Sequence, residues 1–455
     1  LILTEGDSAK STAVSGLAVV GNDYWGVFPL KGKLLNTRGI TIKKLTENEE
    51  LININKILGL TYDLEDRSKL RYGRIMLMTD SDHDGSHIKG LIMNYFACFW
   101  PGLLTNYITY LLTPIVKVNM KNEVLNFYDT HSFNLWKNDN KNINTDQIKY
   151  YKGLGTSTAK EAKEYFQDIV KNQYNYIYDD KEDKESIILA FDKDRADDRK
   201  KWISNSIQNL NKLGINYKNK NINIKSFIDN ELVMFSIYDC SRSLPSMIDG
   251  LKVSQRKILY GSILKKIFNK KDQVKVAQLG AYIAEKTDYH HGEVSLQQAI
   301  VTMAQNFVGR GNIPLLCPEG QFGTRLKGGE DSASARYIFT YLQEYIPIIF
   351  QESDSKILEY NYEDLVQIEP KQYAPIIPML LVNGSSGIAT GWSCDVPCFN
   401  PVDIIKNLKV LINDPESDIE ELTPYYKNFR GQIEKIDDNK WMSKGCYEIK
   451  SKKNI

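Results

Sequence analysis

Features of secreted and membrane proteins are scarce in this 455-residue sequence. Its six cysteines are scattered, so they do not suggest the disulfide framework of a secreted protein. The longest apolar stretch, residues 91–116, is interrupted by Asn94, Pro101 and Asn106, and we expect it not to span a membrane. Hydrophobic residues at 42% and charged residues at 25% are typical of folded globular proteins. The length suggests about three domains.

The sequence also carries little net charge, +1, because 58 Lys and Arg residues are nearly balanced by 57 Asp and Glu residues. This overall balance hides segments in which charges of one sign predominate. Residues 252–275 contain eight bases and one acid, whereas residues 352–369 contain six acids and one base. A basic run is usually a solvated face, but the local field decides where a polyanion binds. A nucleic-acid partner therefore stays open.

Two short apolar runs, residues 1–4 and 75–79, each end at an acid, Glu5 and Asp80. Continuous apolar runs of this length predict strands buried on both faces, as in a parallel sheet. A helical pattern follows the second run, with Ser86 as its expected N-cap. Ligands of such sheets bind beyond the carboxyl ends of the strands, which is where both acids are expected.

Acids alternate at Asp80, Asp82 and Asp84, and a divalent cation would relieve their mutual repulsion. The spacing begins like a calcium loop, but the twelfth position, which needs a bidentate Glu, is Leu91. Hard oxygen ligands at a strand end suit Mg²⁺ instead. The alternative is a capped helix start whose acids lie near the helix dipole.

Other motifs are weaker. Residues 6–12 resemble a phosphate-binding loop, but Ala9 replaces the required Gly before the Lys, so we predict no ATP site there. The pair His290 and His291 favours a phosphate or backbone contact over zinc. Tyr337 follows Arg336, a cation that would suit a phenol attacking phosphorus, although buried aromatic packing is the default interpretation.

The second half of the chain is largely helical at first. Residues 253–267, 276–286 and 294–307 predict three helices with short connections, compatible with a helix-turn-helix module. Residues 137–149 and 218–225 are rich in Asn and Lys and predict loops or linkers.

Several specific segments follow one another along nearly the whole chain. They are residues 5–10 (EGDSAK), 29–33 (PLKGK), 78–87 (MTDSDHDGSH), 152–157 (KGLGTS), 249–252 (DGLK), 255–257 (QRK), 290–293 (HHGE), 321–325 (QFGTR), 335–338 (ARYI) and 387–392 (GIATGW). Together and in this order, they resemble the cleavage core of type IIA DNA topoisomerases in the eukaryotic form.

The resemblance implies an α/β plus α+β multidomain fold. It implies a Rossmann-like TOPRIM domain with a parallel sheet at 1–185, including an insertion near 137–149, and a linker at 186–235. A winged-helix domain with the catalytic tyrosine would follow at 236–372, and an incomplete, mixed α/β tower domain at 373–455. We expect the chain to be a piece of a longer protein.

The resemblance also implies residue roles. Tyr337 would be the nucleophile that forms a 5′-phosphotyrosyl bond, and Arg336 would stabilise the transition state. Glu5, Asp80 and Asp82 would bind Mg²⁺ with support from Asp84, two ions per site, with Mn²⁺ or Ca²⁺ as substitutes. The positions that match DNA contacts in the family are Lys33, Asn36, Arg199, Lys200, Lys252, Tyr289 and Ser295, together with Ile388, which would wedge between base pairs. The basic run 252–275 would then contact the duplex backbone, making binding salt-dependent.

The implied function is cleavage and religation of double-stranded DNA within a homodimeric isomerase. ATP would act only through an ATPase module that precedes this core in the family, where it drives strand passage. The nucleus is the expected location, or the host cytoplasm for a viral enzyme. Two alternatives are a TOPRIM-type metal-dependent nuclease, which would not need Tyr337, and a non-catalytic DNA-bending protein, which would need neither metal nor tyrosine.

Overall fold

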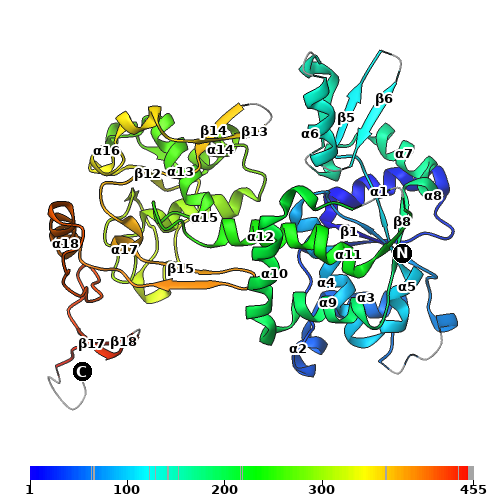
Figure 1. Ribbon diagram of the computed structural model, residues 1–455, viewed down its shortest axis with the longest axis horizontal. Helices are drawn as coiled ribbons and strands as arrows, with labels where there is room; N and C mark the ends of the chain where they lie inside the picture. The colour runs from blue at the N-terminus through cyan, green and yellow to red at the C-terminus, as the bar shows by residue number, and fades with distance from the viewer. Residues whose placement is uncertain are drawn as a thin grey trace. The chain divides into compact units, whose positions relative to one another are not determined.

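The computed structural model describes residues 1–62, 64, 67–121, 123–128, 130–140, 143–151, 153–215, 217, 219–363, 366–438 and 440–448. Lys152 of the 152–157 segment, parts of the two Asn/Lys-rich segments and the last residues of the expected tower domain lie outside these ranges. The chain divides into two compact units, Leu1–Asp239 with Thr390–Trp392, and Cys240–Ala389 with Ser393–Ile455 (Figure 1).

Within its described residues, the first unit has a six-stranded sheet in the order β2-β1-β3-β4-β8-β9. These strands are β1 (Ile2–Glu5), β2 (Val27–Leu30), β3 (Ile75–Met78), β4 (Ile108–Leu111), β8 (Gln173–Ile177) and β9 (Asn221–Asn223). All neighbours are parallel except β4 and β8. The predicted parallel sheet and its first two apolar strands are confirmed.

Both faces of this sheet are covered. Leu3 and Leu77 pack with Ile88 of helix α4 (His83–Phe99) on one face. Their neighbours Ile2 and Met76 pack on the other face in the cluster that contains Ala13 of helix α1 (Gly6–Val20). Alternate residues of each strand thus face opposite apolar layers, which explains the unbroken apolar runs.

The remaining helices of the first unit surround the sheet (Figure 1). They are α2 (Ile42–Glu47), α3 (Glu49–Leu58), α5 (Leu104–Tyr107), α7 (Ala159–Gln167), α8 (Ile169–Asn172), α9 (Glu182–Phe191), α10 (Ala196–Gln208) and α11 (Ile224–Phe227); helix α12 (Val233–Ser243) runs on into the second unit. A three-stranded antiparallel sheet joins β6 (Val124–Phe127), β5 (Val116–Asn119) and β7 (Ile148–Tyr150). Helix α6 (Thr130–Asp139) packs on it through Phe133.

The segment 186–235, predicted as a linker, is an integral part of the first unit. It holds most of α9, all of α10 and α11, and the edge strand β9. Ile222, Ile224 and Phe227 are buried in the main core of the unit. The Asn and Lys residues between them dominate the composition, so the sequence pattern concealed these few core positions.

The second unit contains the three predicted helices, α13 (Val253–Leu264), α14 (Val276–Lys286) and α15 (Glu293–Ala304). They pack against a small antiparallel sheet in the order β10-β12-β11, formed by β10 (Val274–Lys275), β11 (Leu316–Glu319) and β12 (Phe339–Leu342). Three helices against a three-stranded sheet are the arrangement expected for a winged helix.

Shorter elements complete this unit: α16 (Ile346–Ile349), β13 (Tyr360–Glu363), β14 (Val366–Pro370), α17 (Met379–Asn383), β15 (Ser385–Ile388), β16 (Ser393–Val396), α18 (Pro401–Asn413), β17 (Gln432–Asp437) and β18 (Lys440–Lys444). Strands β15 and β16 form an antiparallel hairpin.

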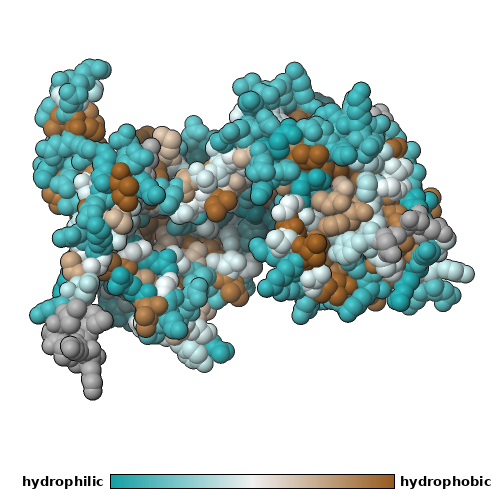
Figure 2. Space-filling view, turned by 90° about the horizontal axis from the view of Figure 1, so that it is seen from below, coloured by the Kyte–Doolittle hydropathy of each residue, from teal (hydrophilic) through white to brown (hydrophobic). Residues whose placement is uncertain are grey.

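Hydrophilic residues cover most of the visible face, and hydrophobic residues are confined to small groups (Figure 2). Among the described residues, every helix is too short or too polar to cross a membrane.

Candidate metal centre and tyrosine turn

The sheet brings Glu5 and Asp80 together although 75 positions separate them in sequence. Strands β1 and β3 are parallel neighbours with Thr4 opposite Met78, so their carboxyl ends meet at one edge of the sheet. The backbone N–H of Asp80 donates a hydrogen bond to Glu5 Oε2 at 3.1 Å. The two acids lie where ligands of parallel sheets bind.

Asp82, not Ser86, caps helix α4, which corrects the N-cap prediction. The helix begins at His83, and Asp82 Oδ1 accepts a hydrogen bond from the N–H of Gly85 at 2.7 Å. Ser86 lies inside the first turn, where its hydroxyl donates to the carbonyl of Asp82 at 3.1 Å and to Glu231 at 2.7 Å. The capped helix start and the acidic cluster are thus the same structure.

The carboxylates of this cluster repel one another. Burial, reinforced by the charges of Asp80 and Asp82, raises the pKa of Glu5 to about 7. Burial also raises the pKa of Asp80, with a further contribution from Asp82. Oxygen ligands that hold an excess of negative charge in a half-buried place match the needs of a hard divalent cation. The residues present therefore fit such an ion.

Asp84 lies on the first turn of α4 and faces a cation from the neighbouring segment. Lys33 Nζ lies 2.6 Å from Asp84 Oδ1, and the Asp84 side chain is largely buried. This ion pair places Lys33, one of the residues predicted to contact DNA, beside the acidic cluster.

A loop that the spacing of charged and apolar residues did not reveal completes the cluster. The N–H of Leu154 donates to Asp80 Oδ1 at 2.7 Å. A Cβ atom added to Gly153 would lie 2.6 Å from Asp80 Oδ2, so only glycine leaves room for the carboxylate. The one signal in the sequence was the segment 152–157, which entered only through the family resemblance.

Tyr337 lies on an exposed turn immediately before β12. Its side chain is 66% exposed, so the default expectation of buried packing is wrong. The carbonyls of its neighbours Ala335 and Ile338 accept hydrogen bonds from the N–H groups of Ala277 and Val276 at the start of α14, both at 3.0 Å. The Arg336 guanidinium lies 5.0 Å from the centroid of the Tyr337 ring. The backbone is thus fixed while the phenol faces solvent.

Two of the predicted DNA contacts line one hollow of the second unit. Lys252 and Ser295 border a cavity of about 980 Å³ that also includes Ser386 on β15. Lys252 Nζ donates to the Ser386 carbonyl at 2.8 Å. Ile388, at the end of β15, is 83% exposed, which is unusual for an isoleucine and suits an apolar wedge.

The other predicted contacts differ in accessibility. Lys200 is partly exposed and pairs with Asp197 at 2.8 Å, and Tyr289 lies edge-on to the ring of His291. Asn36 donates to the Phe191 carbonyl at 2.8 Å, and Arg199 is 9% exposed with its guanidinium bound to backbone carbonyls. Both of these side chains hold the first unit together from within.

The basic run 252–275 is not a uniform DNA-facing surface. Arg256 is buried and forms two hydrogen bonds with Asp249, at 2.6 and 2.9 Å. Lys257 is buried against Glu369 at 2.9 Å. The expectation that the whole run contacts duplex backbone is therefore wrong for these two residues, because acids elsewhere in the chain pair with them in the core.

Comparisons with known proteins agree with this arrangement. The family model of the Toprim domain matches residues 1–113, that of the C-terminal associated domain of TOPRIM matches 111–240, and that of DNA gyrase/topoisomerase IV matches 242–455. Among curated proteins, DNA topoisomerase 2 of Drosophila melanogaster is 50% identical over 99% of this chain and 32% of its own length. DNA topoisomerase 2-alpha of Homo sapiens is 47% identical over 98% of this chain and 30% of its own length.

The chain thus spans about a third of the length of these curated relatives. Among solved structures, the DNA-binding, cleavage and re-ligation domain of Plasmodium falciparum topoisomerase II has a TM-score of 0.79 and 46% identity, over 97% of this chain and 60% of that one. The matches run from the acidic cluster to the tyrosine turn in the order that the motifs predicted. Three successive family models, the curated relatives and the solved structure thus agree that nearly the whole chain is similar to type II DNA topoisomerases.

Proposed function

We propose that this chain is the DNA cleavage and religation core of a type II topoisomerase. It would cut double-stranded DNA by transesterification to Tyr337, with a divalent cation, Mg²⁺, held by Glu5, Asp80 and Asp82. One observation carries the proposal: a carboxylate cluster fit for a cation and an exposed tyrosine beside an arginine occur on one chain. A nuclease or a DNA-bending protein needs at most one of the two.

Tyr337, Arg336 and the acidic residues each have a different proposed role in phosphodiester transfer. The Tyr337 phenol loses its proton as its oxygen attacks phosphorus, and a bond from phosphorus to the tyrosine oxygen forms. The bond from phosphorus to the 3′ oxygen breaks, and the 3′ oxygen takes up a proton, which leaves a 3′ hydroxyl. Arg336 lies close enough to the phenol to stabilise negative charge on the phosphoryl oxygens. A cation held by Glu5, Asp80 and Asp82 would, when bound, supply stabilisation of the charge that develops on the leaving oxygen. Attack by the 3′ hydroxyl reverses the exchange, so religation needs no ATP.

Residues other than the three ligands support the same site. Asp84 fixes Lys33 beside the cluster, where its ammonium can neutralise an approaching phosphate. Lys200, Lys252, Tyr289 and Ser295 are proposed as further DNA contacts, with Ile388 as the wedge that bends the duplex. Asn36 and Arg199 remain in this proposed set, although their described hydrogen bonds stay within the first unit.

The proposal also covers the oligomeric state of the protein and its location in the cell. Two copies of the chain are proposed to act as a homodimer in which the tyrosine of one copy works with the cation of the other, so that both strands are cut.

The relatives that this chain resembles are eukaryotic, which favours the nucleus as its location, with the host cytoplasm as the alternative for a viral enzyme. ATP-driven strand passage would require the ATPase module of the full-length enzyme, and we expect no ATP-dependent relaxation from these 455 residues.

The proposal is tested by incubating plasmid DNA with Mg²⁺ and the chain, then quenching with detergent. Protein attached to 5′ ends in the wild type and absent in Tyr337→Phe supports transesterification. Cleavage with free ends that survives the mutation would instead establish a metal-dependent nuclease. Bending of DNA without cleavage by either protein would establish the non-catalytic alternative.

A further inference from the structure

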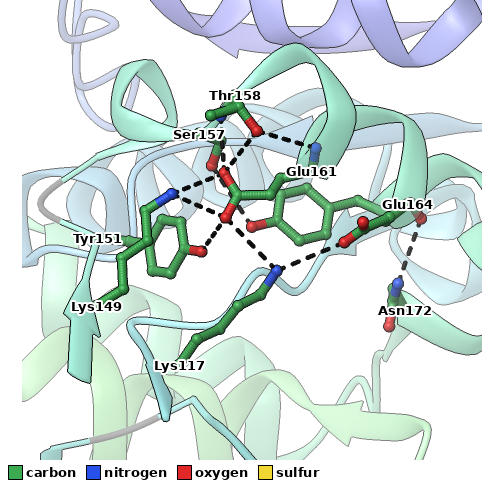
Figure 3. Close-up of polar contacts among 9 residues, drawn as sticks. Lys117, Lys149, Tyr151, Ser157, Thr158, Glu161, Glu164 and Asn172 are labelled. Carbon is green, nitrogen blue, oxygen red and sulfur yellow. Dashed lines mark hydrogen bonds and ion pairs between the residues drawn. The ribbon is translucent and has the colours of Figure 1, made fainter. Parts of the chain in front are cut away.

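The loop that contacts Asp80 is held at both ends by one carboxylate. The described residues 151 and 153–158 form a loop between β7 and α7, and the N–H of Leu154 in this loop binds Asp80. At the start of the loop, the Tyr151 hydroxyl donates to Glu161 Oε1. At its end, the N–H and hydroxyl of Thr158 donate to Glu161 Oε2 at 2.8 and 3.0 Å (Figure 3). Glu161 thus ties the two ends of the loop together.

The same carboxylate also binds the three-stranded sheet. Lys149 of β7 donates to both oxygens of Glu161 at 2.8 Å, and Lys117 of β5 lies 3.9 Å from Oε1 (Figure 3). The Lys149 ammonium lies 4.6 Å from the centroid of the Tyr151 ring, and Lys117 lies over the rings of Tyr151 and Tyr165. The Glu161 carboxylate therefore links the three-stranded sheet to the loop.

Glu161 is charged in this environment. Burial alone would raise its pKa, but the hydrogen bonds from Lys149, Tyr151 and Thr158 outweigh burial and lower the pKa to about 2. Glu161 also completes a capping box, because its own N–H donates to the Thr158 hydroxyl at 3.2 Å. A charge-assisted network of this kind holds a loop more firmly than neutral hydrogen bonds do.

We infer that Glu161 is a positioning residue for the metal centre: it fixes the loop of residues 151 and 153–158 so that the Leu154 N–H holds the Asp80 carboxylate in its ligating orientation. This inference rests on the proposed function, because it assumes that Asp80 binds the cation. Groups that orient metal ligands through hydrogen bonds typically change metal affinity by about 10- to 100-fold when they are removed. Here the orienting group acts through a backbone N–H rather than on the ligand directly.

The test uses Glu161→Gln, which keeps the shape of the side chain but removes the charge and one acceptor oxygen. Glu164→Gln is the matched control, because Glu164 lies about one turn along the same helix and pairs with Lys117 at 3.8 Å, and its side chain has no hydrogen bond or ion pair with the described residues of the loop. Binding of Mn²⁺ to each protein is followed by electron paramagnetic resonance. Cleavage is titrated with Mg²⁺, and DNA affinity is measured in EDTA.

We expect Glu161→Gln to weaken Mn²⁺ binding about tenfold and to raise the Mg²⁺ concentration for half-maximal cleavage by a similar factor. DNA affinity in EDTA and cleavage at saturating Mg²⁺ should match those of Glu164→Gln. A folded Glu161→Gln protein whose Mn²⁺ affinity lies within about twofold of the control overturns the inference. Should that variant not fold, Tyr151→Phe removes a single hydroxyl, and an unchanged Mn²⁺ affinity would overturn the inference equally.

The outcome is separable from the proposed function. If wild-type protein forms no tyrosine-linked DNA at any Mg²⁺ concentration, the proposed function fails, whereas the Mn²⁺ affinities still report on Glu161. If wild-type protein forms that product and Glu161→Gln leaves both metal titrations unchanged, only the positioning role fails.

Discussion

The acidic cluster of the first unit and the tyrosine turn of the second are built in opposite ways. Glu5 and Asp80 are half-buried, and their oxygens accept hydrogen bonds from backbone groups of distant segments. Tyr337 is 66% exposed, and no hydrogen bond to its hydroxyl occurs among the described residues. The proposed metal ligands are thus held by hydrogen bonds within their own unit, whereas the proposed nucleophile is exposed to solvent.

The largest effect is expected for Tyr337→Phe. This change should abolish the covalent DNA adduct completely while altering the free energy of unfolding by only about 0.5 kcal/mol or less, because the side chain is exposed. Tyr362→Phe is the control, since Tyr362 is 64% exposed in the same unit. Adduct formation is measured by detergent quench and stability by urea unfolding. A comparable loss of adduct in Tyr362→Phe would remove the special role of Tyr337.

Arg256→Met should produce the largest loss of stability. The substitution leaves Asp249 buried without its ion-pair partner, and such losses cost about 3–5 kcal/mol. The exposed pair of Lys270 with Glu319 provides the control, because Lys270→Met should cost about 1 kcal/mol or less. Urea unfolding measures both. If Arg256→Met left stability intact and only reduced the salt dependence of DNA binding, the buried ion pair would be the wrong interpretation.

Asp80→Asn should separate activity from stability at the acidic cluster. Removing one of the repelling carboxylates is expected to stabilise the metal-free protein slightly, by about 1 kcal/mol, and to abolish Mg²⁺-dependent cleavage. Thermal unfolding in EDTA and the cleavage assay measure the two effects. Asp194→Asn, at an exposed acid outside the cluster, should change neither. A destabilised Asp80→Asn protein would mean that the carboxylates are not under mutual repulsion.

The smallest effect concerns pH. The pKa of Glu161 is lowered to about 2, so its charge stabilises the fold fully above the ordinary value of 4.5 and loses that contribution as pH falls towards 2. The difference in melting temperature between wild type and Glu161→Gln should therefore shrink between about pH 5 and about pH 2. A difference that stays constant across this range would contradict a strongly hydrogen-bonded charge at Glu161.

Sequence reasoning succeeded where local pattern and topology agree. The runs ending at Glu5 and Asp80 predicted strands of a parallel sheet, and the helices of the second unit matched their apolar periodicity. It failed at the N-cap, because Asp82 and Ser86 both suit that position and only backbone geometry selects between them. It also failed for residues 186–235, where polar composition concealed a strand and core helices. The roles assigned to Tyr337, Arg336 and the DNA contacts remain predictions.

The sequence by itself determined the two apolar strands of the parallel sheet, the three helices of the second unit, the acids at the strand ends and, through its motifs, the resemblance to a family. Those features are local, since residue spacing and type decide them. Only the tertiary structure decided which bases are buried and which contact solvent, that Leu154 holds Asp80 across 74 positions, and that Glu161 ties the loop. The physical reason is that the fold decides which charged group or N–H lies next to which partner. Residues far apart in sequence become neighbours in space, and local sequence patterns do not specify such contacts.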